Sequence, residues 1–404
     1  MFEKTSNMEN KIRKYLAQFD LDIRKSNYAR FMDQKVTPDV LSIIADCVLN
    51  YDANQYLSFS KNDIWSSPYF NENVKYIFNK PDASNKAANN EYDKFISQPL
   101  LTLAYAQVLS LKKQGNINIF QIKNKEILEF VALKERNAYR FLVVYLNQIL
   151  DQSNLTKHFH FFKNKSLQGR AENEDYCELR DRFIRFIIGN TPINGEVEVR
   201  RIFPKILNIY ACHNNIQGVI RGRISTYPFI FSDLMYNRVN WRDKDKNKSE
   251  TRTEADLENK VQETNYYNNY LVQKAISFIN KHYKESEVKD SIGNGIATHV
   301  HHIFMKSQFP ELASYLENLI KLTPTQHLTK AHPNNNTSIV DRDYQLICLL
   351  SKADSIEKSL NKGEFFYSKE SFIYVINTGL DVNLEVSLSF ERIKTELTLI
   401  YNKL

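Results

Sequence analysis

Apolar side chains recur at the spacing of an amphipathic helix along much of the chain. Ile12, Leu16 and Phe19 belong to a helical region over residues 8–50, within which Pro38 suits the first turn of a second helix. The same spacing predicts further helices over residues 97–114, 125–151, 176–188, 263–284 and 344–360.

Three stretches depart from this helical pattern. Residues 66–92 are polar and contain Pro68 and Pro81, so loops are expected there. Residues 193–232 are richer in glycine and β-branched side chains, which predicts a mixture of helix and short strands. Residues 243–262 have almost no apolar side chains and are expected to form a linker or solvated loop at a domain boundary.

The composition is that of an ordinary globular chain. Of its 404 residues, 42% are hydrophobic and 25% charged, which argues against a largely disordered or fibrous protein. No apolar run approaches the roughly 18 residues of a membrane span, and the N-terminus lacks the apolar segment of an export signal. We therefore expect a cytoplasmic protein without a membrane partner. The net charge of +7 is compatible with nucleic-acid binding and does not prove it.

The histidines are concentrated in one short segment. Five of the nine lie between residues 299 and 332, namely His299, His301, His302, His327 and His332. Imidazole is both a common metal ligand and the natural base near neutral pH, so such a cluster calls for a chemical interpretation.

The sequence around these histidines predicts strand, loop, strand and helix. Residues 296–304 and 318–323 have the composition of short strands. A short helix then begins at Pro324, because Thr323 and Gln326 have the spacing of a capping box, and it ends near residue 333. A histidine pair therefore lies at the end of the first strand, and another histidine lies in the first turn of the helix.

This unit resembles the HNH, or ββα-metal, nuclease motif. The matching residues are His302, Asn318 sixteen positions later, and His327 nine further on. The resemblance implies that His302 is the general base, that His301 and His327 bind one divalent metal, and that Asn318 holds the loop carrying His302. Unlike many members of this superfamily, the chain has no paired cysteines for a structural zinc ion.

His332 is the candidate third ligand. Some members place a further histidine four residues after the helix histidine, whereas His332 is five residues after His327. On an ideal α-helix this spacing puts the two side chains about 140° apart. His332 is therefore expected to bind the metal only if the helix frays before residue 333. His299 shares strand parity with His301, and a structural or phosphate-facing role is expected for it.

The residue types suit hydrolysis of a phosphodiester. Imidazole accepts a proton from water near neutral pH, and a divalent cation neutralises the charge that develops on the phosphate and the leaving oxygen. Mg²⁺ is the expected cofactor because the reacting groups are hard oxygens, while the histidines would also accept Mn²⁺, Co²⁺ or Ni²⁺.

Arginines are concentrated in a second region. Eleven of the 18 lie within residues 170–252, where guanidinium groups could read guanine edges and contact phosphates. Many of them are close to carboxylates, so salt-bridged helix faces remain the alternative for each single arginine. The candidate DNA-binding residues are Arg221, Arg223, Arg238, Asn240 and Arg242.

Three further segments look like parts of Type II restriction endonucleases that carry an HNH domain. They are residues 29–40, 134–142 and 236–243, and the overall layout is similar to the MboII-like Type IIS group. The resemblance implies a short asymmetric DNA target, cleavage outside it, and a companion DNA methyltransferase encoded nearby. The recognition sequence and the oligomeric state do not follow from it.

We therefore expect an α+β protein with a mostly helical N-terminal region and a C-terminal ββα-metal nuclease domain. The expected parts are a DNA-recognition and scaffold region, a charged linker with a helix, the nuclease domain and a packing tail, over residues 1–240, 241–289, 290–345 and 346–404. The expected activity is site-specific cleavage of double-stranded DNA. Two alternatives stay open: a homing or non-specific HNH nuclease, and a non-catalytic DNA-binding protein whose histidines hold zinc.

Overall fold

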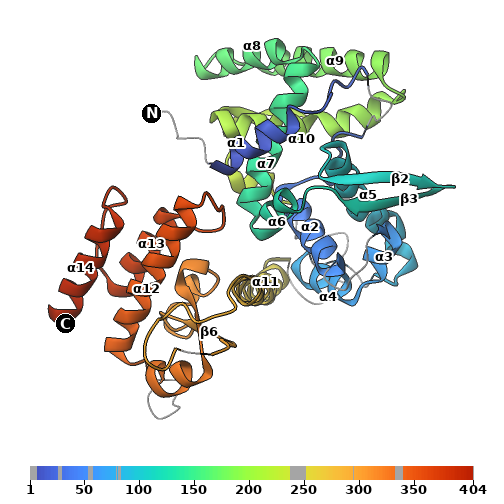
Figure 1. The fold of residues 1–404 in the computed structure, drawn as a ribbon. Helices are drawn as coiled ribbons and strands as arrows, with labels where there is room; N and C mark the ends of the chain where they lie inside the picture. The colour runs from blue at the N-terminus through green and yellow to red at the C-terminus, as the bar shows by residue number, and fades with distance from the viewer. Residues whose placement is uncertain are drawn as a thin grey trace. The chain divides into compact units, whose positions relative to one another are not determined.

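The computed structural model describes residues 7–25, 30–52, 58–78, 80, 83–236, 252–293, 295–332 and 340–403. The chain forms two compact units, Met1–Glu263 and Thr264–Leu404 (Figure 1). Both are mainly helical and carry small antiparallel sheets, so the α+β class expected from the sequence is confirmed.

The first unit is built from helices that surround α7 (Glu135–Gln152). Helix α7 packs against five of the others, α1, α2, α6, α8 and α10. Its Phe141 and Tyr145 rings stack with their centroids 5.7 Å apart, and the Tyr145 hydroxyl donates to the Phe31 carbonyl at 2.7 Å. The other helices are α1 (Asn7–Leu16), α2 (Pro38–Asp52), α3 (Lys61–Ser66), α4 (Pro68–Ile77), α5 (Asn89–Tyr105), α6 (Lys125–Leu133), α8 (Thr156–Leu167), α9 (Asn173–Asn190) and α10 (Glu196–Asn214).

Local chain geometry explains where these helices differ from the predictions. The loop expected over residues 66–92 was wrong for residues 68–77 and from residue 89 onward, which are helical. Pro68 occupies the first position of α4, and the Ser67 hydroxyl accepts a hydrogen bond from Phe70 N at 3.4 Å. The single helix predicted over 125–151 is divided into α6 and α7, because Lys134 is extended with φ −148°. Helix α9 confirms the prediction over 176–188.

A three-stranded sheet replaces the second half of a predicted helix. Helix α5 ends at Tyr105, Gln107 takes a left-handed conformation with φ +60°, and the chain continues as β2 (Leu109–Gln114) and β3 (Ile117–Ile122). With β1 (Phe59–Ser60), these strands form an antiparallel sheet in the order β1–β3–β2. The helix predicted over 97–114 was therefore wrong beyond Tyr105, because the apolar side chains that follow belong to a strand.

The mixture of helix and strands predicted over 193–232 is confirmed. Helix α10 ends at Asn214, and Asn215 follows in the left-handed conformation that often terminates helices. The chain then forms a hairpin from β4 (Gln217–Ile220) and β5 (Arg223–Pro228).

The linker expected over residues 243–262 was wrong for its second part. Helix α11 (Arg252–His282) already begins at Arg252, while residues 243–251 lie outside the described residues. Seven of the eleven residues from 252 to 262 are Arg, Glu, Ala, Leu, Lys or Gln, which are strong helix formers even without a continuous apolar stripe. The division between the two units falls within this helix.

The second unit places a two-stranded sheet beside a group of C-terminal helices. Strands β6 (His299–His302) and β7 (Leu319–Leu322) pair antiparallel and are followed by a π-helical turn, η5 (Gln326–Ala331). The C-terminal helices are α12 (Arg342–Asn361), α13 (Lys369–Leu380) and α14 (Phe390–Lys403). Residues 290–345 and 346–404, which the sequence treated as separate parts, therefore belong to one compact unit.

A buried ion pair links helix α12 to Glu287, which lies between α11 and β6 and is hydrogen-bonded to β7. The Lys352 ammonium lies 2.8 Å from the Glu287 carboxylate, and both side chains are almost completely inaccessible to solvent. Glu287 also accepts a hydrogen bond from the Lys321 backbone N–H in β7 at 2.9 Å, and Lys352 donates to the Tyr367 hydroxyl at 2.9 Å. Burial lowers the pKa of Lys352, and the adjacent Glu287 carboxylate opposes that shift.

We expect Lys352→Met to lower the free energy of unfolding by about 3–5 kcal/mol, because the Glu287 carboxylate would stay buried without its counter-ion. Lys394→Met is the matched control, since Lys394 forms a largely exposed pair with Asp354 at 2.6 Å and should cost at most about 1 kcal/mol. Urea unfolding measures both variants. Equal losses in the two would show that the buried pair does not hold β7 against α12.

Candidate metal and nuclease site

The two strands place the histidine pair at the end of β6. His301 lies opposite Ile320 and His302 lies opposite Leu319, so the two imidazoles leave the sheet on opposite faces. His301 is buried and His302 is half-buried. The two predicted strands are confirmed, although β6 is shorter than the predicted segment 296–304.

The capping box predicted after the second strand is present. Gln326 N donates to the Thr323 hydroxyl at 3.2 Å, and the Gln326 side-chain oxygen accepts from Thr323 N at 3.1 Å. The same amide donates to the carbonyl of Val288 at 3.0 Å and to Asp290 at 2.9 Å. This buried glutamine therefore fixes the turn that carries His327 to the preceding loop.

The turn after Gln326 is a π-helix, and this changes the position of His332. The His332 backbone N–H donates to the His327 carbonyl at 3.1 Å, which is the five-residue hydrogen bond of a π-turn. Residues five apart therefore come to one side of the turn, and the two imidazole centroids lie 4.9 Å apart. The separation of about 140° expected for an α-helix does not apply here, because the turn is π-helical and ends at Ala331, so that His332 follows it with an extended backbone at φ −123° and ψ 90°.

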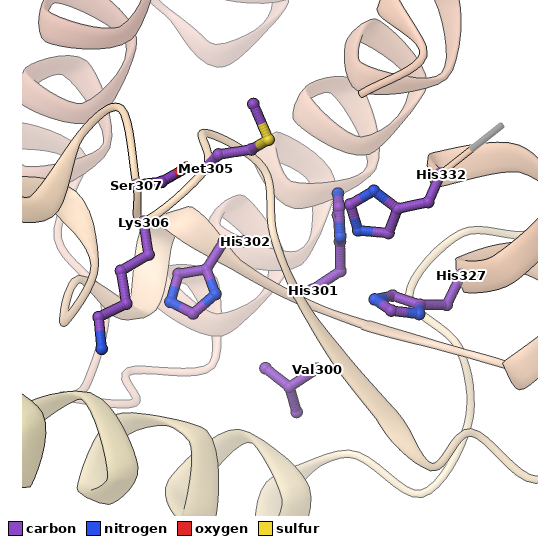
Figure 2. A pocket seen from close by; sticks show the side chains of 8 residues that line it. All are labelled: Val300, His301, His302, Met305, Lys306, Ser307, His327 and His332. Carbon is purple, nitrogen blue, oxygen red and sulfur yellow. The ribbon is translucent and has the colours of Figure 1, made fainter. Parts of the chain in front are cut away.

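Three imidazoles converge in this arrangement, those of His301, His327 and His332 (Figure 2). One nitrogen from each lies within 4.8 Å of the other two, and the His301 ring centroid is 4.8 Å from that of His332 and 5.4 Å from that of His327. Histidine nitrogens bind divalent ions at about 2.1 Å, so small ring rotations would bring all three onto one ion.

Burial and hydrogen bonding at these rings fit a metal. The buried Nδ1 of His327 has no hydrogen-bond partner among the described residues, and coordination would satisfy it. Burial, together with neighbouring His332 and His299, lowers the pKa of His327 to about 4. Burial also lowers the pKa of His301 well below its usual range, with His332, His327 and His302 adding to the shift. Neutral imidazole is the form that binds metals.

His299 lies beside this group and is not part of it. Its ring stacks on that of His327 with centroids 4.9 Å apart and an interplanar angle of 28°. Its Nδ1 is 3.0 Å from the Thr298 hydroxyl. Its position fits the structural role expected from the sequence.

His302 is oriented by a backbone carbonyl. Its Nε2 lies 3.0 Å from the Ala313 oxygen, and because a carbonyl only accepts, Nε2 carries the proton. In the neutral ring the lone pair is therefore on Nδ1. Burial lowers the pKa of His302, and the hydrogen bond to Ala313 opposes that shift.

Asn318 holds the segment that follows His302. Its side chain is completely buried and accepts from Phe304 N at 2.8 Å. Its amide group donates to the carbonyl of Phe304 at 3.0 Å and to that of Leu312 at 3.2 Å. From helix α12, Gln345 donates to the Ile303 carbonyl at 2.7 Å. These bonds match the bridging geometry that the sequence resemblance implied for Asn318.

The three converging histidines and His302 line one open cavity of about 480 Å³. It is lined by Val300, His301, His302, Met305, Lys306, Ser307, His327 and His332 (Figure 2). Lys306 and Ser307 were not identified from the sequence, although their position four and five residues after His302 is a usable signal. The Lys306 ammonium is exposed and donates to the Asn269 side chain of α11 at 2.8 Å.

The candidate DNA-binding residues fall into two groups. Arg221 lies with Gly222 in the β4–β5 turn, where both residues have positive φ, and Arg223 begins β5. Arg221 and Arg223 are exposed. Arg238, Asn240 and Arg242 lie outside the described residues, so their predicted role stays a prediction.

Other arginines in this region are engaged in surface ion pairs, as the alternative interpretation expected. Arg180 pairs with Asp181 at 2.8 Å, and Arg182 pairs with Glu178 at 2.7 Å. Arg200 pairs with Glu196 at 3.1 Å.

Comparison of the chain with protein-family models, with curated proteins and with solved structures found no match. Within the described residues, no helix has the length and apolar character needed to cross a membrane.

We expect His327→Ala and His332→Ala each to weaken binding of Co²⁺ by roughly 100-fold or more, because removal of even an outer-shell group costs about 10- to 100-fold. His299→Ala is the matched control and should retain affinity, since its ring lies outside the converging group. Titration calorimetry and the visible spectrum of Co²⁺ report binding. If His332→Ala binds as tightly as the control, His332 is not a ligand.

Proposed function

We propose that this chain is a metal-dependent endonuclease that hydrolyses phosphodiester bonds in double-stranded DNA. The observation that carries the proposal is the convergence of His301, His327 and His332 in the same cavity as His302. The sequence resemblance extends it to a Type II restriction enzyme with a companion methyltransferase. That extension concerns target choice and is separate from the chemistry of the site.

In this proposal His302 is the general base. Its Nε2 proton is held by the Ala313 carbonyl, which leaves Nδ1 to take a proton from water. The Ala313 oxygen also stabilises the imidazolium that forms, because it accepts a stronger hydrogen bond from a charged ring. Asn318 acts as a positioning residue, since its hydrogen bonds fix the backbone directly after His302.

The three converging histidines would hold one divalent cation. When bound, the cation supplies positive charge that stabilises the developing charge on the phosphate and the leaving oxygen. Three neutral imidazoles do not reduce that charge, as carboxylate ligands would. The exposed Lys306 on the cavity wall is placed to contact a phosphate oxygen, since its flexible ammonium can exchange Asn269 for the substrate.

The arrangement favours catalysis over a purely structural zinc site. Structural zinc sites are usually closed by four protein ligands, whereas this group offers three histidines beside an open cavity. His302 has no ligand role in the group and is oriented separately by Ala313. A homing or non-specific HNH nuclease would share this centre, so only the pattern of cleavage separates it from a restriction enzyme.

The first experiment incubates the purified protein with unmethylated DNA of known sequence, with divalent metals or with EDTA. Discrete metal-dependent fragments would support a site-specific endonuclease, and their ends would give the target and the cut positions. A smear would indicate a non-specific nuclease. Intact DNA with every metal, together with tight stoichiometric zinc, would favour the non-catalytic DNA-binding protein.

We expect His302→Ala to lower the rate of DNA cleavage by roughly 10²- to 10⁴-fold, the usual contribution of a general base. DNA binding and Co²⁺ binding should be unchanged, because His302 contacts neither ligand in the proposal. His160→Ala, at an exposed histidine of α8, is the control and should cleave normally. Retained cleavage in His302→Ala would remove His302 from the role of base.

We expect Mn²⁺, Co²⁺ or Ni²⁺ to support cleavage at lower concentration than Mg²⁺. The expectation of Mg²⁺ from the sequence rested on the hard oxygens of the reacting groups, whereas three converging imidazoles favour borderline ions that bind nitrogen more strongly. Cleavage rates measured across metal concentrations test this order. Activity that saturates first with Mg²⁺ would argue against a three-histidine site.

A further inference from the structure

The β2–β3 hairpin extends well beyond the sheet to which it belongs. Strand β1 pairs only with Phe120 and Ile119 of β3, whereas the hairpin continues outward to the Gln114–Ile117 pair. Every residue from 112 to 117 is exposed. In Figure 1 the hairpin projects away from the helices at its base within the first unit.

The outer part of the hairpin has little to stabilise it. A two-stranded ribbon without a packed face is marginally stable in water. Gly115, with φ +58°, permits the tight turn between the strands, and the Ile117 side chain near the tip is 54% exposed. An extended ribbon with an exposed apolar residue at its tip is therefore suited to contact with a partner.

The charge of the hairpin indicates what that partner is. The sequence contains no Asp or Glu between Asp93 and Glu126. Lys112 and Lys113 are exposed, and neither forms an ion pair or side-chain hydrogen bond within the described part of the chain. Two unneutralised lysines on a ribbon without carboxylates are complementary to a polyanion.

The side chains along the ribbon are also of the types that read bases. The cross-strand pairs Lys112–Ile119 and Gln114–Ile117 share one face, together with Gln121. Glutamine forms paired hydrogen bonds with adenine, and an apolar group contacts the thymine methyl, while a lysine at the same edge can reach a phosphate. A two-stranded ribbon has the width that the major groove of DNA admits.

We propose that the β2–β3 hairpin is a DNA-binding element that enters a groove of the duplex. Lys112 and Lys113 contact phosphates, and Gln114 and Gln121 face base edges. This inference rests on the proposed function, because it assigns part of target recognition to a segment separate from the arginine-rich region. It is distinct from the chemistry at the histidine cavity, so the two can be tested apart.

A partner protein that adds a strand to the free edge of β2 is the weaker alternative. Lysines on an edge strand disfavour such pairing, because charged side chains there oppose the approach of another strand. Lys112 and Lys113 both lie on β2, which is one of the two edge strands of the sheet.

The test measures binding of a fluorescent DNA duplex in EDTA, where cleavage cannot occur. We expect Lys112→Ala/Lys113→Ala to weaken binding roughly 10- to 100-fold at about 0.1 M salt and to reduce the salt-dependence slope by about 2. Arg13→Ala/Lys14→Ala removes two adjacent exposed charges from α1 and is the matched control. Gln114→Ala/Gln121→Ala should reduce preference for the target over random duplex without changing the slope.

The outcomes separate this inference from the proposed function. Unchanged binding in the lysine variant would overturn the role of the hairpin, while cleavage by the unchanged protein would still support the nuclease. Hairpin-dependent binding without cleavage in any metal would support the hairpin and reject the nuclease. Equal losses on duplex DNA and on heparin would indicate a general polyanion surface and overturn insertion into a groove.

Discussion

The geometry of the histidine cavity depends on the buried side chain of Asn318. Its amide binds both backbone groups of Phe304 and also the carbonyl of Leu312, so it closes the loop between β6 and β7 from within. His302 precedes this clamp and its hydrogen-bond partner Ala313 follows it. An amide can satisfy donors and acceptors at once, whereas a carboxylate could not donate to either carbonyl.

The sequence predicted the strands and hydrogen bonds of this site better than the position of its third histidine. The strands, the capping box and the bridging asparagine follow from residue types and short spacings, and these elements were found where expected. The position of His332 did not follow, because it depends on the hydrogen-bond ladder changing from four residues to five. A π-turn has no clear local sequence signal, so the α-helical rotation was the only available estimate.

The same limitation explains the largest error in the fold. Leu100, Leu103 and Leu111 suit one face of a continuing helix, whereas Leu109 and Leu111 have the two-residue spacing of a strand. The deciding residue is Gly115, which lies between two apolar runs and marks a hairpin turn, as the positive φ there bears out. The helix predicted over 97–114 therefore included strand β2 of the exposed ribbon, and Lys112 and Lys113 were not identified as part of a binding surface.

The neutral ligands and the separate position of His302 would both suit hydrolysis with one metal ion. The converging ligands are three imidazoles, so a bound divalent ion would keep its full charge for the phosphate. The proposed base must stay outside the coordination sphere, because a coordinated nitrogen has no lone pair for a proton. Alternation along β6 accomplishes this separation, since neighbouring residues His301 and His302 leave opposite faces of the strand. In the proposed function the adjacent pair would provide a ligand and a base, and the hydrogen bond to Ala313 leaves Nδ1 of His302 available.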